Sequence, residues 1–250
     1  MLRASIYKTK RLLHRHPAAY SFAYGLATTN LDYLRQRLAA GQYLSSFGGL
    51  WTDRHDYPDR LAAKQAAGAI SEALLPQLEA WRSEGYLILR RAVDHKLIDL
   101  YLEEVEALKS RQPSPLLVTS ISLDQPVPYS PRVLQENYSV RTVDDYFFSE
   151  AGRQILMRPP ITDFLQVVFE CAPVLTQSLN FEHGSQQAIH QDTAFVRMNS
   201  PRKLVGVWIA LEDVRPGTGE LIYYPGSHRW PDFRFSGHFK HYDEERDGPC

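Results

Sequence analysis

The strongest constraint on the fold is a change of pattern near residue 174. From there on, short β-prone runs are separated by turns rich in Gly, Ser and Pro; they span 174–182, 188–195, 203–211 and 220–224. Short strands at such close spacing are typical of an antiparallel sandwich or barrel. The sequence therefore predicts a β-rich core that follows a mostly helical first part, which is an α+β chain.

The first part of the chain carries helical patterns with a few interruptions. Helices are predicted over 31–44, 60–81, 95–110 and 146–171. Asp94 is the expected N-cap of the third helix, and Pro159 with Pro160 interrupts the fourth. Short strands are predicted at 86–89 and 116–121. The prolines between 113 and 131 otherwise predict a loop.

Composition excludes several classes of protein. With 250 residues, the chain is long enough to bury a hydrophobic core. Its net charge of -1 provides no excess of positive charge to attract a polyanion, so no nucleic-acid partner is expected. No apolar run reaches the length of a membrane span, and no signal-peptide core is present, so we expect a cytoplasmic protein. The cysteines, Cys171 and Cys250, do not form a metal or disulfide pattern, and Cys171 is expected to be buried. The basic stretch 1–31 is interpreted as a solvated helix face; a transit peptide or an anionic surface contact is the alternative.

The segment that carries chemistry is the triplet His190-Gln191-Asp192. Residues two apart on a β-strand project to the same face, so an imidazole nitrogen and a carboxylate oxygen would lie side by side inside the sandwich. Two His and one carboxylate on one face hold non-haem Fe(II). The triplet alone is a weak signal, because a surface pair or a hydrogen-bonded core histidine has the same pattern.

The residues that follow the triplet make the metal-site prediction more specific. Residues 205–213 read Val-Gly-Val-Trp-Ile-Ala-Leu-Glu-Asp, a Gly-containing turn follows, and 221–228 ends in Pro-Gly-Ser-His. This order resembles the phytanoyl-CoA dioxygenase family of Fe(II)/2-oxoglutarate-dependent oxygenases, and 81–89 resembles that family's opening element. The resemblance implies a double-stranded β-helix, or jelly-roll, core over 79–250, with 1–78 as a helical N-terminal extension.

The same resemblance implies roles for particular residues. His190 and Asp192 would bind Fe(II), and Gln191 and Trp208 would lie against 2-oxoglutarate. Further polar contacts to 2-oxoglutarate are expected from the preceding strand, at Gln177 and Asn180. Trp208 is equally consistent with a core aromatic residue. An indirect role for Gln191 is as open as a direct one, because it points away from its two neighbours.

One part of the family's site has no counterpart here. The family supplies its distal histidine, and an arginine for 2-oxoglutarate, from a strand well past the Pro-Gly-Ser-His turn, but this sequence ends at Cys250. The later histidines, His228, His238 and His241, do not lie in a suitable pattern. We therefore expect a jelly roll that is incomplete at its C-terminus, and a chain that holds iron poorly by itself.

The expected activity is hydroxylation of an aliphatic C–H bond in a small molecule, using O2 and 2-oxoglutarate and releasing succinate and CO2. Asp192 speaks against a halogenase, in which a small residue replaces this carboxylate. A non-catalytic jelly-roll binding module is the main alternative. A zinc-dependent hydrolase has less support, since no His-Glu-x-x-His motif occurs, and serine catalysis lacks a nucleophile elbow. The substrate and the oligomeric state are not indicated.

Overall fold

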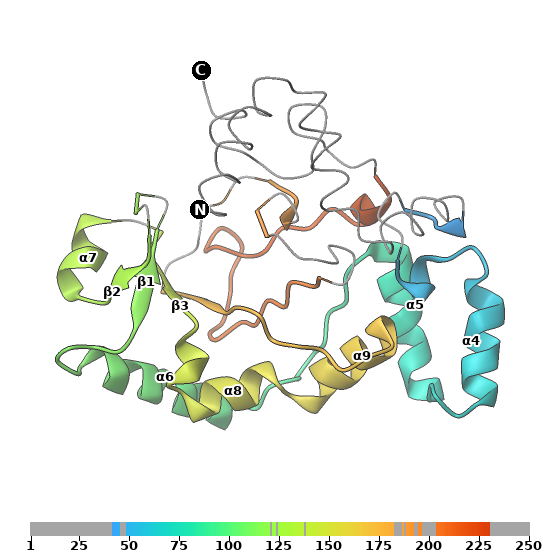
Figure 1. Ribbon diagram of the computed structural model, residues 1–250, viewed down its shortest axis with the longest axis horizontal. Coiled ribbons are helices and arrows are strands. Elements are labelled where there is room, and N and C mark those ends of the chain that lie inside the picture. Colours follow the sequence, from blue (N-terminus) through green and yellow to red (C-terminus); the bar gives the residue numbers. More distant parts are fainter. Residues whose placement is uncertain are drawn as a thin grey trace, which may run out of the picture. The chain divides into compact units, whose positions relative to one another are not determined.

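The computed structural model describes residues 42–45, 49–120, 122, 123, 125–137, 139–182, 187, 189–192, 195, 196 and 204–230 (Figure 1). The chain divides into two units. One consists of Met1–Ala62, Gln191–Leu204 and His228–Cys250, and the other of Ala63–His190 and Val205–Ser227. The predicted boundary at residue 78 stays a prediction. The basic stretch 1–31 and most of the predicted helix 31–44 lie outside the described residues.

The first unit contains a stacked aromatic pair. Trp51, in η2 (Trp51–Asp53), lies with its ring centroid 5.4 Å from that of Tyr57 at the start of α4 (Tyr57–Ala66). Both side chains are buried. Beside them, Arg54 and Arg60 contact the Asp56 carboxylate at 2.7 and 3.0 Å. Their hydrogen bonds hold the pKa of Asp56 well below its usual range.

The second unit contains most of the described helices. They are η3 (Glu72–Leu74), α5 (Leu75–Glu84), α6 (His95–Lys109), α7 (Pro131–Glu136), η4 (Asp145–Phe147), α8 (Glu150–Leu156) and α9 (Pro159–Phe169); η7 (Ser227–Arg229) follows later in the chain. The prediction for α6 is confirmed, including its cap, because Asp94 Oδ1 accepts a hydrogen bond from the Lys96 backbone N–H at 2.8 Å.

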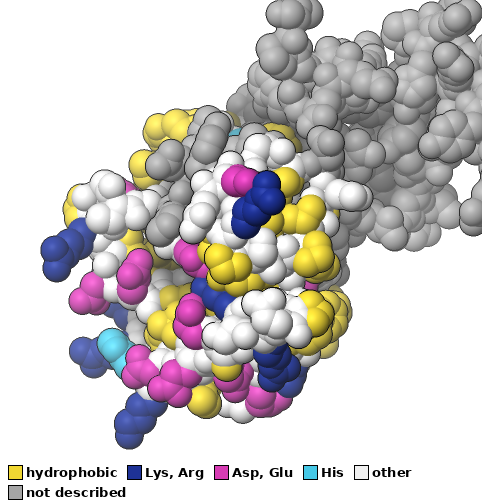
Figure 2. All heavy atoms as spheres, turned by 90° about the vertical axis from the view of Figure 1, so that its left-hand side faces the viewer, with side chains coloured by type: hydrophobic (Ala, Val, Ile, Leu, Met, Phe, Trp, Pro, Cys, Tyr) yellow, Lys and Arg dark blue, Asp and Glu magenta, His cyan; other side chains and the backbone are white. Residues whose placement is uncertain are grey.

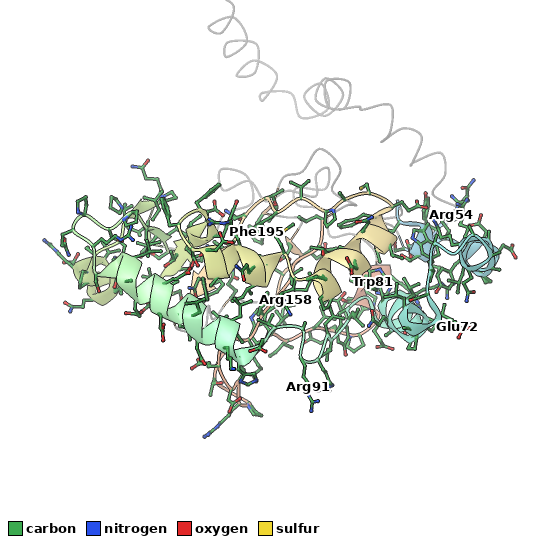
Figure 3. All side chains as sticks on the ribbon, turned by 90° about the horizontal axis from the view of Figure 1, so that it is seen from below. Arg54, Glu72, Trp81, Arg91, Arg158 and Phe195 are labelled. Atoms are coloured by element: carbon green, nitrogen blue, oxygen red, sulfur yellow. The ribbon has the colours of Figure 1, made fainter. Side chains whose placement is uncertain are left out.

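Two predicted helices are each divided by a local breaker. The stretch 60–81 separates into α4, η3 and α5, with Gly68 in the left-handed region at φ +68° just after α4 ends. The stretch 146–171 is divided before Pro159, as predicted, and α9 begins there because proline fits the first turn of a helix. Figure 3 shows Trp81 of α5 turned toward α9, where its ring lies edge-on to Phe164 at 5.7 Å.

A small antiparallel sheet has the strand order β2-β1-β3-β4. Its strands are β1 (Leu117–Thr119), β2 (Val127–Pro128), β3 (Arg141–Val143) and β4 (Leu179–Phe181). The predicted strand at 116–121 is confirmed as β1. The register aligns Val118 with Thr142 and Thr142 with Asn180, so these residues share one face, and Val118 and Thr142 are buried there.

The helices α6 and α8 lie side by side (Figure 1) and form the core next to the sheet. Tyr101 and Val105 of α6 pack with Ala151 and Ile155 of α8, and all are at most 6% exposed. The later segment 204–211 contributes Ile209 and Leu211 to the rim of this cluster. The α+β class is thus confirmed in the form of helices packed beside a four-stranded antiparallel sheet.

Several predicted strands are wrong in the part of the chain that the structure describes. Residues 86–89, 204–211 and 220–224, and the described residues of 188–195, form neither strand nor bridge there. A β-prone segment becomes a strand only when a neighbour pairs with its backbone. Next to 86–89 and 220–224, two single hydrogen bonds are formed instead: Gly226 N donates to Glu84 O at 2.8 Å, and Tyr223 Oη donates to Gly85 O at 3.2 Å.

On the face drawn in Figure 2, Lys and Arg side chains alternate with Asp and Glu, without a large area of one sign. Among the described residues, no helix has the length and apolarity that crossing a membrane requires.

Cys171 is exposed, so the expectation that it is buried is wrong; it follows the C-terminus of α9, where the chain leaves the core.

Candidate functional site

The His190–Asp192 segment has a different local structure from the one predicted. His190 and Asp192 are exposed and Gln191 is half-buried. Asp192 lies in a single turn, in which its carbonyl oxygen accepts hydrogen bonds from the N–H groups of Phe195 and Val196, each at 2.9 Å. The strand prediction is therefore wrong here, because in these described residues a turn takes up backbone groups that a ladder would need. The role of both side chains as metal ligands stays a prediction.

Asn180 and Gln177 lie in different surroundings. The side chain of Asn180, on β4, donates from Nδ2 to Tyr101 Oη at 2.9 Å and to Asp145 Oδ2 at 3.2 Å. Because both amide hydrogens are used in this way, only its carbonyl oxygen is left for a ligand. Gln177 precedes β4 and is exposed. The contacts of both residues with 2-oxoglutarate stay predictions.

Asn180 belongs to a buried polar network that joins α6, η4 and β4. Tyr101 donates from Oη to Asp145 Oδ2 at 2.5 Å, and Ser178 Oγ lies 3.4 Å from Asp145 Oδ1. Asp145 is only 2% exposed, so its carboxylate depends on these partners. Burial, and then the neighbouring Asp145 charge, raise the pKa of Tyr101 far above its ordinary value.

Trp208 lies on the outer side of the 204–211 segment. Its side chain is 47% exposed, whereas Ile209 and Leu211 pack against the Tyr101 cluster. The alternative interpretation, a core aromatic residue, is therefore wrong. Its contact with 2-oxoglutarate stays a prediction.

Arg141 is a candidate residue that sequence reasoning missed. It lies on β3 opposite Phe181 of β4, one residue before the buried Thr142, and therefore on the other face of the sheet. Its Nε is buried and has no hydrogen-bond partner among the residues that the structure describes. A buried guanidinium N–H without an acceptor is costly, and a carboxylate is the acceptor whose geometry matches it best. Only the register of β3, which the sequence does not reveal, could have pointed to it.

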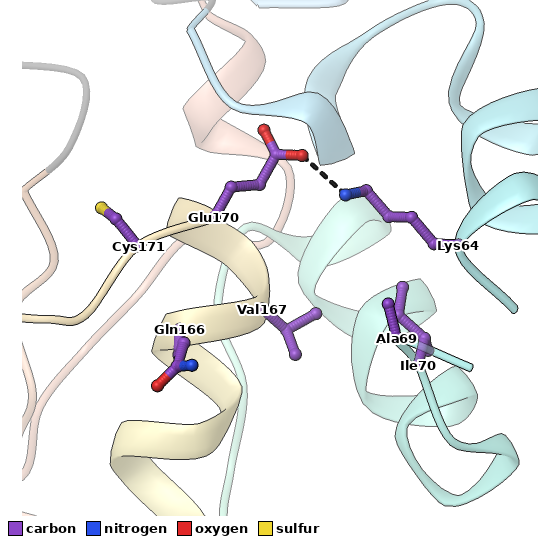
Figure 4. A pocket seen from close by; sticks show the side chains of 7 residues that line it. All are labelled: Lys64, Ala69, Ile70, Gln166, Val167, Glu170 and Cys171. Atoms are coloured by element: carbon purple, nitrogen blue, oxygen red, sulfur yellow. Dashed lines mark hydrogen bonds and ion pairs between the residues drawn. The ribbon is translucent and has the colours of Figure 1, made fainter. Parts of the chain in front are cut away.

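A separate cavity of about 260 Å³ lies between α9 and the chain that follows α4 (Figure 4). Lys64 reaches across it to Glu170, with 2.6 Å between Nζ and Oε1. Ala69, Ile70 and Val167 make up much of the wall, and Cys171 is the nearby thiol. An ion pair and aliphatic side chains provide no acid, base or metal pair, so this cavity has no catalytic set.

The described residues contain no group of three His, Cys, Asp or Glu side chains able to hold a metal ion together. An imidazole and a carboxylate are nevertheless the ligand types that non-haem Fe(II) takes, and His190 and Asp192 supply them. The buried Arg141 Nε, without a partner among the described residues, is a donor of the type that a carboxylate accepts from. In chemical type, the residues present fit an oxygenase that uses iron and a 2-oxo acid.

Comparison with known proteins identifies the class. Residues 81–249 match the model of the family described as Phytanoyl-CoA dioxygenase (PhyH), whose members typically use Fe(II) and 2-oxoglutarate. The match covers the triplet, the Trp208 segment and the Pro-Gly-Ser-His turn. This chain belongs to the phytanoyl-CoA dioxygenase family.

One curated relative is the Phytanoyl-CoA dioxygenase domain-containing protein 1 of Bos taurus. It is 38% identical over 60 residues, which make up 22% of this chain and 21% of the relative. The match thus spans about a fifth of that protein's length. No solved structure matches the chain.

Proposed function

We propose that this protein is an Fe(II)- and 2-oxoglutarate-dependent dioxygenase that hydroxylates an aliphatic C–H bond of a small molecule. The observation that carries the proposal is the family match over 81–249, which includes His190-Gln191-Asp192. Within it, His190 and Asp192 are the metal ligands. The family's double-stranded β-helix is the proposed arrangement of the core, with the sheet of β1 to β4 as one part of it.

The protein's own groups have defined tasks in this proposal. His190 would hold the metal through a ring nitrogen and Asp192 through a carboxylate oxygen. When bound, iron and 2-oxoglutarate supply the oxidising chemistry, with succinate and CO2 as products. Gln191 and Trp208 stay the proposed neighbours of 2-oxoglutarate.

We add Arg141 to this set as the residue that binds a carboxylate of 2-oxoglutarate. Its Nε is already desolvated, so a bound carboxylate gains a charge-assisted hydrogen bond without further burial of the donor. Phe181, its cross-strand neighbour, is half-buried on the same face of the sheet. The face of the sheet that carries Arg141 would then be the one turned toward the co-substrate.

The direct test is succinate formation from 2-oxoglutarate by the full chain with Fe(II), in air and under nitrogen. Because the chain is expected to hold iron poorly by itself, Fe(II) is supplied in excess. We expect oxygen-dependent succinate under these conditions, lost in His190→Ala and Asp192→Ala and retained in the matched surface variants His55→Ala and Asp99→Ala. Anaerobic equilibrium dialysis with Fe(II) gives a second readout. Iron retention that is the same with and without His190 would refute the ligand assignment. Iron and 2-oxoglutarate binding without succinate would favour the non-catalytic module.

Arg141→Gln tests the co-substrate contact separately. A hydrogen bond to a charged group contributes about 1.5–3 kcal/mol, so the KM for 2-oxoglutarate should rise by about 10-fold to 150-fold. Iron retention in dialysis should change little. The control Arg132→Gln removes an exposed arginine of α7 that pairs with Glu136, and it should leave this KM unchanged. An unaltered KM in Arg141→Gln would rule out the contact.

A further inference from the structure

We propose that the cavity where α6 and α9 begin binds a phosphate group. The site is independent of the proposed oxygenase chemistry, because none of its residues belongs to the His190–Asp192 segment or lies beside Arg141 in the sheet. The cavity has a volume of about 480 Å³ and is lined by Arg91, Val93, Asp94, His95, Lys96 and Arg158. This space is large enough for a phosphate ester as well as for the free ion.

Positive charge dominates the lining. Arg91, Lys96 and Arg158 are cationic, Asp94 is the one acid among the lining residues, and His95 adds a ring that can gain a proton. None of the salt bridges of the described residues involves these three cations. Like charges gathered in one cavity repel each other, and an oxyanion relieves that repulsion. The charge of the lining thus indicates an anionic ligand.

The position of each cation suits a small oxyanion. Arg158 is half-buried and donates from Nε to the Ala92 carbonyl oxygen at 3.3 Å, which holds the guanidinium next to the loop before α6. Figure 3 shows Arg91 projecting away from the ribbon, while Arg158 lies close to the start of α9. The half-buried Arg158 guanidinium and the exposed Arg91 and Lys96 side chains line the same cavity and can together bind a phosphate.

The Asp94 carboxylate repels an anion, but it also caps α6. Its Oδ1 accepts the hydrogen bond from the Lys96 backbone N–H, so part of its charge is used in capping α6. Asparagine caps a helix about as well as aspartate. Asp94→Asn therefore removes the repulsion while keeping the helix start, and it should strengthen phosphate binding.

The experiment is isothermal titration calorimetry of the full chain with inorganic phosphate, at constant ionic strength set with chloride. We expect saturable binding, weakened at least about fivefold in Lys96→Gln and strengthened at least about threefold in Asp94→Asn, as loss and gain of nearby charge require. Arg158→Gln should weaken binding further. Lys96→Gln keeps the test valid if loss of the Arg158 bond to Ala92 unfolds the chain.

The matched control is Arg90→Gln, which removes an exposed arginine next to the site that does not line the cavity. An equal loss of affinity in Arg90→Gln would overturn the proposal, because it would mean that net charge alone attracts phosphate. Parallel titrations with glycerol 3-phosphate and with phosphatidic acid vesicles distinguish a soluble ester from a lipid headgroup. Binding in any arm that depends on Lys96 supports the site, and absence of binding in all arms overturns it.

Discussion

Replacing Tyr101 with phenylalanine removes one hydroxyl from the network at the centre of the second unit. That hydroxyl donates to Asp145 at 2.5 Å and accepts from Asn180 at 2.9 Å. Tyr101 is 6% exposed and Asp145 2%, so water cannot replace the lost bond easily. A hydrogen bond to a charged group contributes about 1.5–3 kcal/mol to stability.

The remaining partners of the carboxylate limit the loss. Asn180 Nδ2 still lies 3.2 Å from Asp145 Oδ2, and Ser178 Oγ lies 3.4 Å from the other oxygen. Each Asp145 oxygen therefore keeps a hydrogen-bond donor, and the carboxylate is not left as an isolated buried charge. We expect Tyr101→Phe to lower the free energy of unfolding by about 2–3 kcal/mol at pH 7, measured by urea denaturation with an unchanged m value.

The same variant also tests how the stability of the protein depends on pH. Burial and the Asp145 charge raise the pKa of Tyr101 in the folded protein, whereas the unfolded chain has the ordinary value of about 10. Above that value the unfolded state releases a proton that the folded state retains, so the wild type loses stability as the pH rises. Phenylalanine cannot titrate. The stability difference between wild type and variant should therefore shrink by about 1.4 kcal/mol between pH 7 and pH 11.

The matched control is Tyr86→Phe, since Tyr86 packs its ring against Tyr223 at 5.0 Å and its hydroxyl makes no hydrogen bond within the described residues. That change should stay within about 0.5 kcal/mol. Equal stabilities of wild type and Tyr101→Phe at pH 7 would refute the network's contribution. A difference that stays constant up to pH 11 would refute the assignment of the raised pKa.

Two further variants test the contact between α6 and α8. In Gly152→Ala the new methyl group would lie 3.0 Å from Ser149 Oγ and 3.1 Å from Tyr101 Cε2, so crowding should destabilise the fold by about 1–3 kcal/mol in the same denaturation assay. Ser149→Ala removes the N-cap hydroxyl of α8, which accepts from Gly152 N at 2.8 Å and donates to Glu104 at 2.5 Å. The free energy of unfolding should fall by about 2 kcal/mol, and Ser149→Thr should retain part of this stability. A stability equal to wild type in either alanine variant would contradict the packing described.

Helices could be predicted from the sequence wherever a local signal marks their ends. Asp94 caps α6 through a bond that spans two residues, and Pro159 begins α9 because of its own fixed backbone angle. Both signals depend only on neighbours in the chain. The Ala-rich composition of 60–81 predicts one continuous helix, but Gly68, in the left-handed region, follows the end of α4.

Strands could be predicted less well, because their formation depends on partners far along the chain. The run 116–121 became β1 because β2 and β3 pair with its two edges. The run 86–89 has similar residues, but its described neighbours offer single contacts, such as the 5.0 Å ring contact of Tyr86 with Tyr223. β-propensity measures fit to a pleated, paired surface, so it does not reveal which run finds a partner.

The rule that residues two apart share a face is correct where strands pair and wrong where they do not. It does not apply to His190 and Asp192, whose described residues form no strand, but it holds in β3 and β4. There it places Asn180 on the buried face and Arg141 on the opposite one, whereas the family resemblance implied a further co-substrate contact at Asn180 and none at Arg141. Asn180→Ala should therefore lower stability more than it raises the KM for 2-oxoglutarate, and Arg141→Gln should do the reverse. If both variants changed the same quantity, the two faces of the sheet would not have the separate tasks that the register implies.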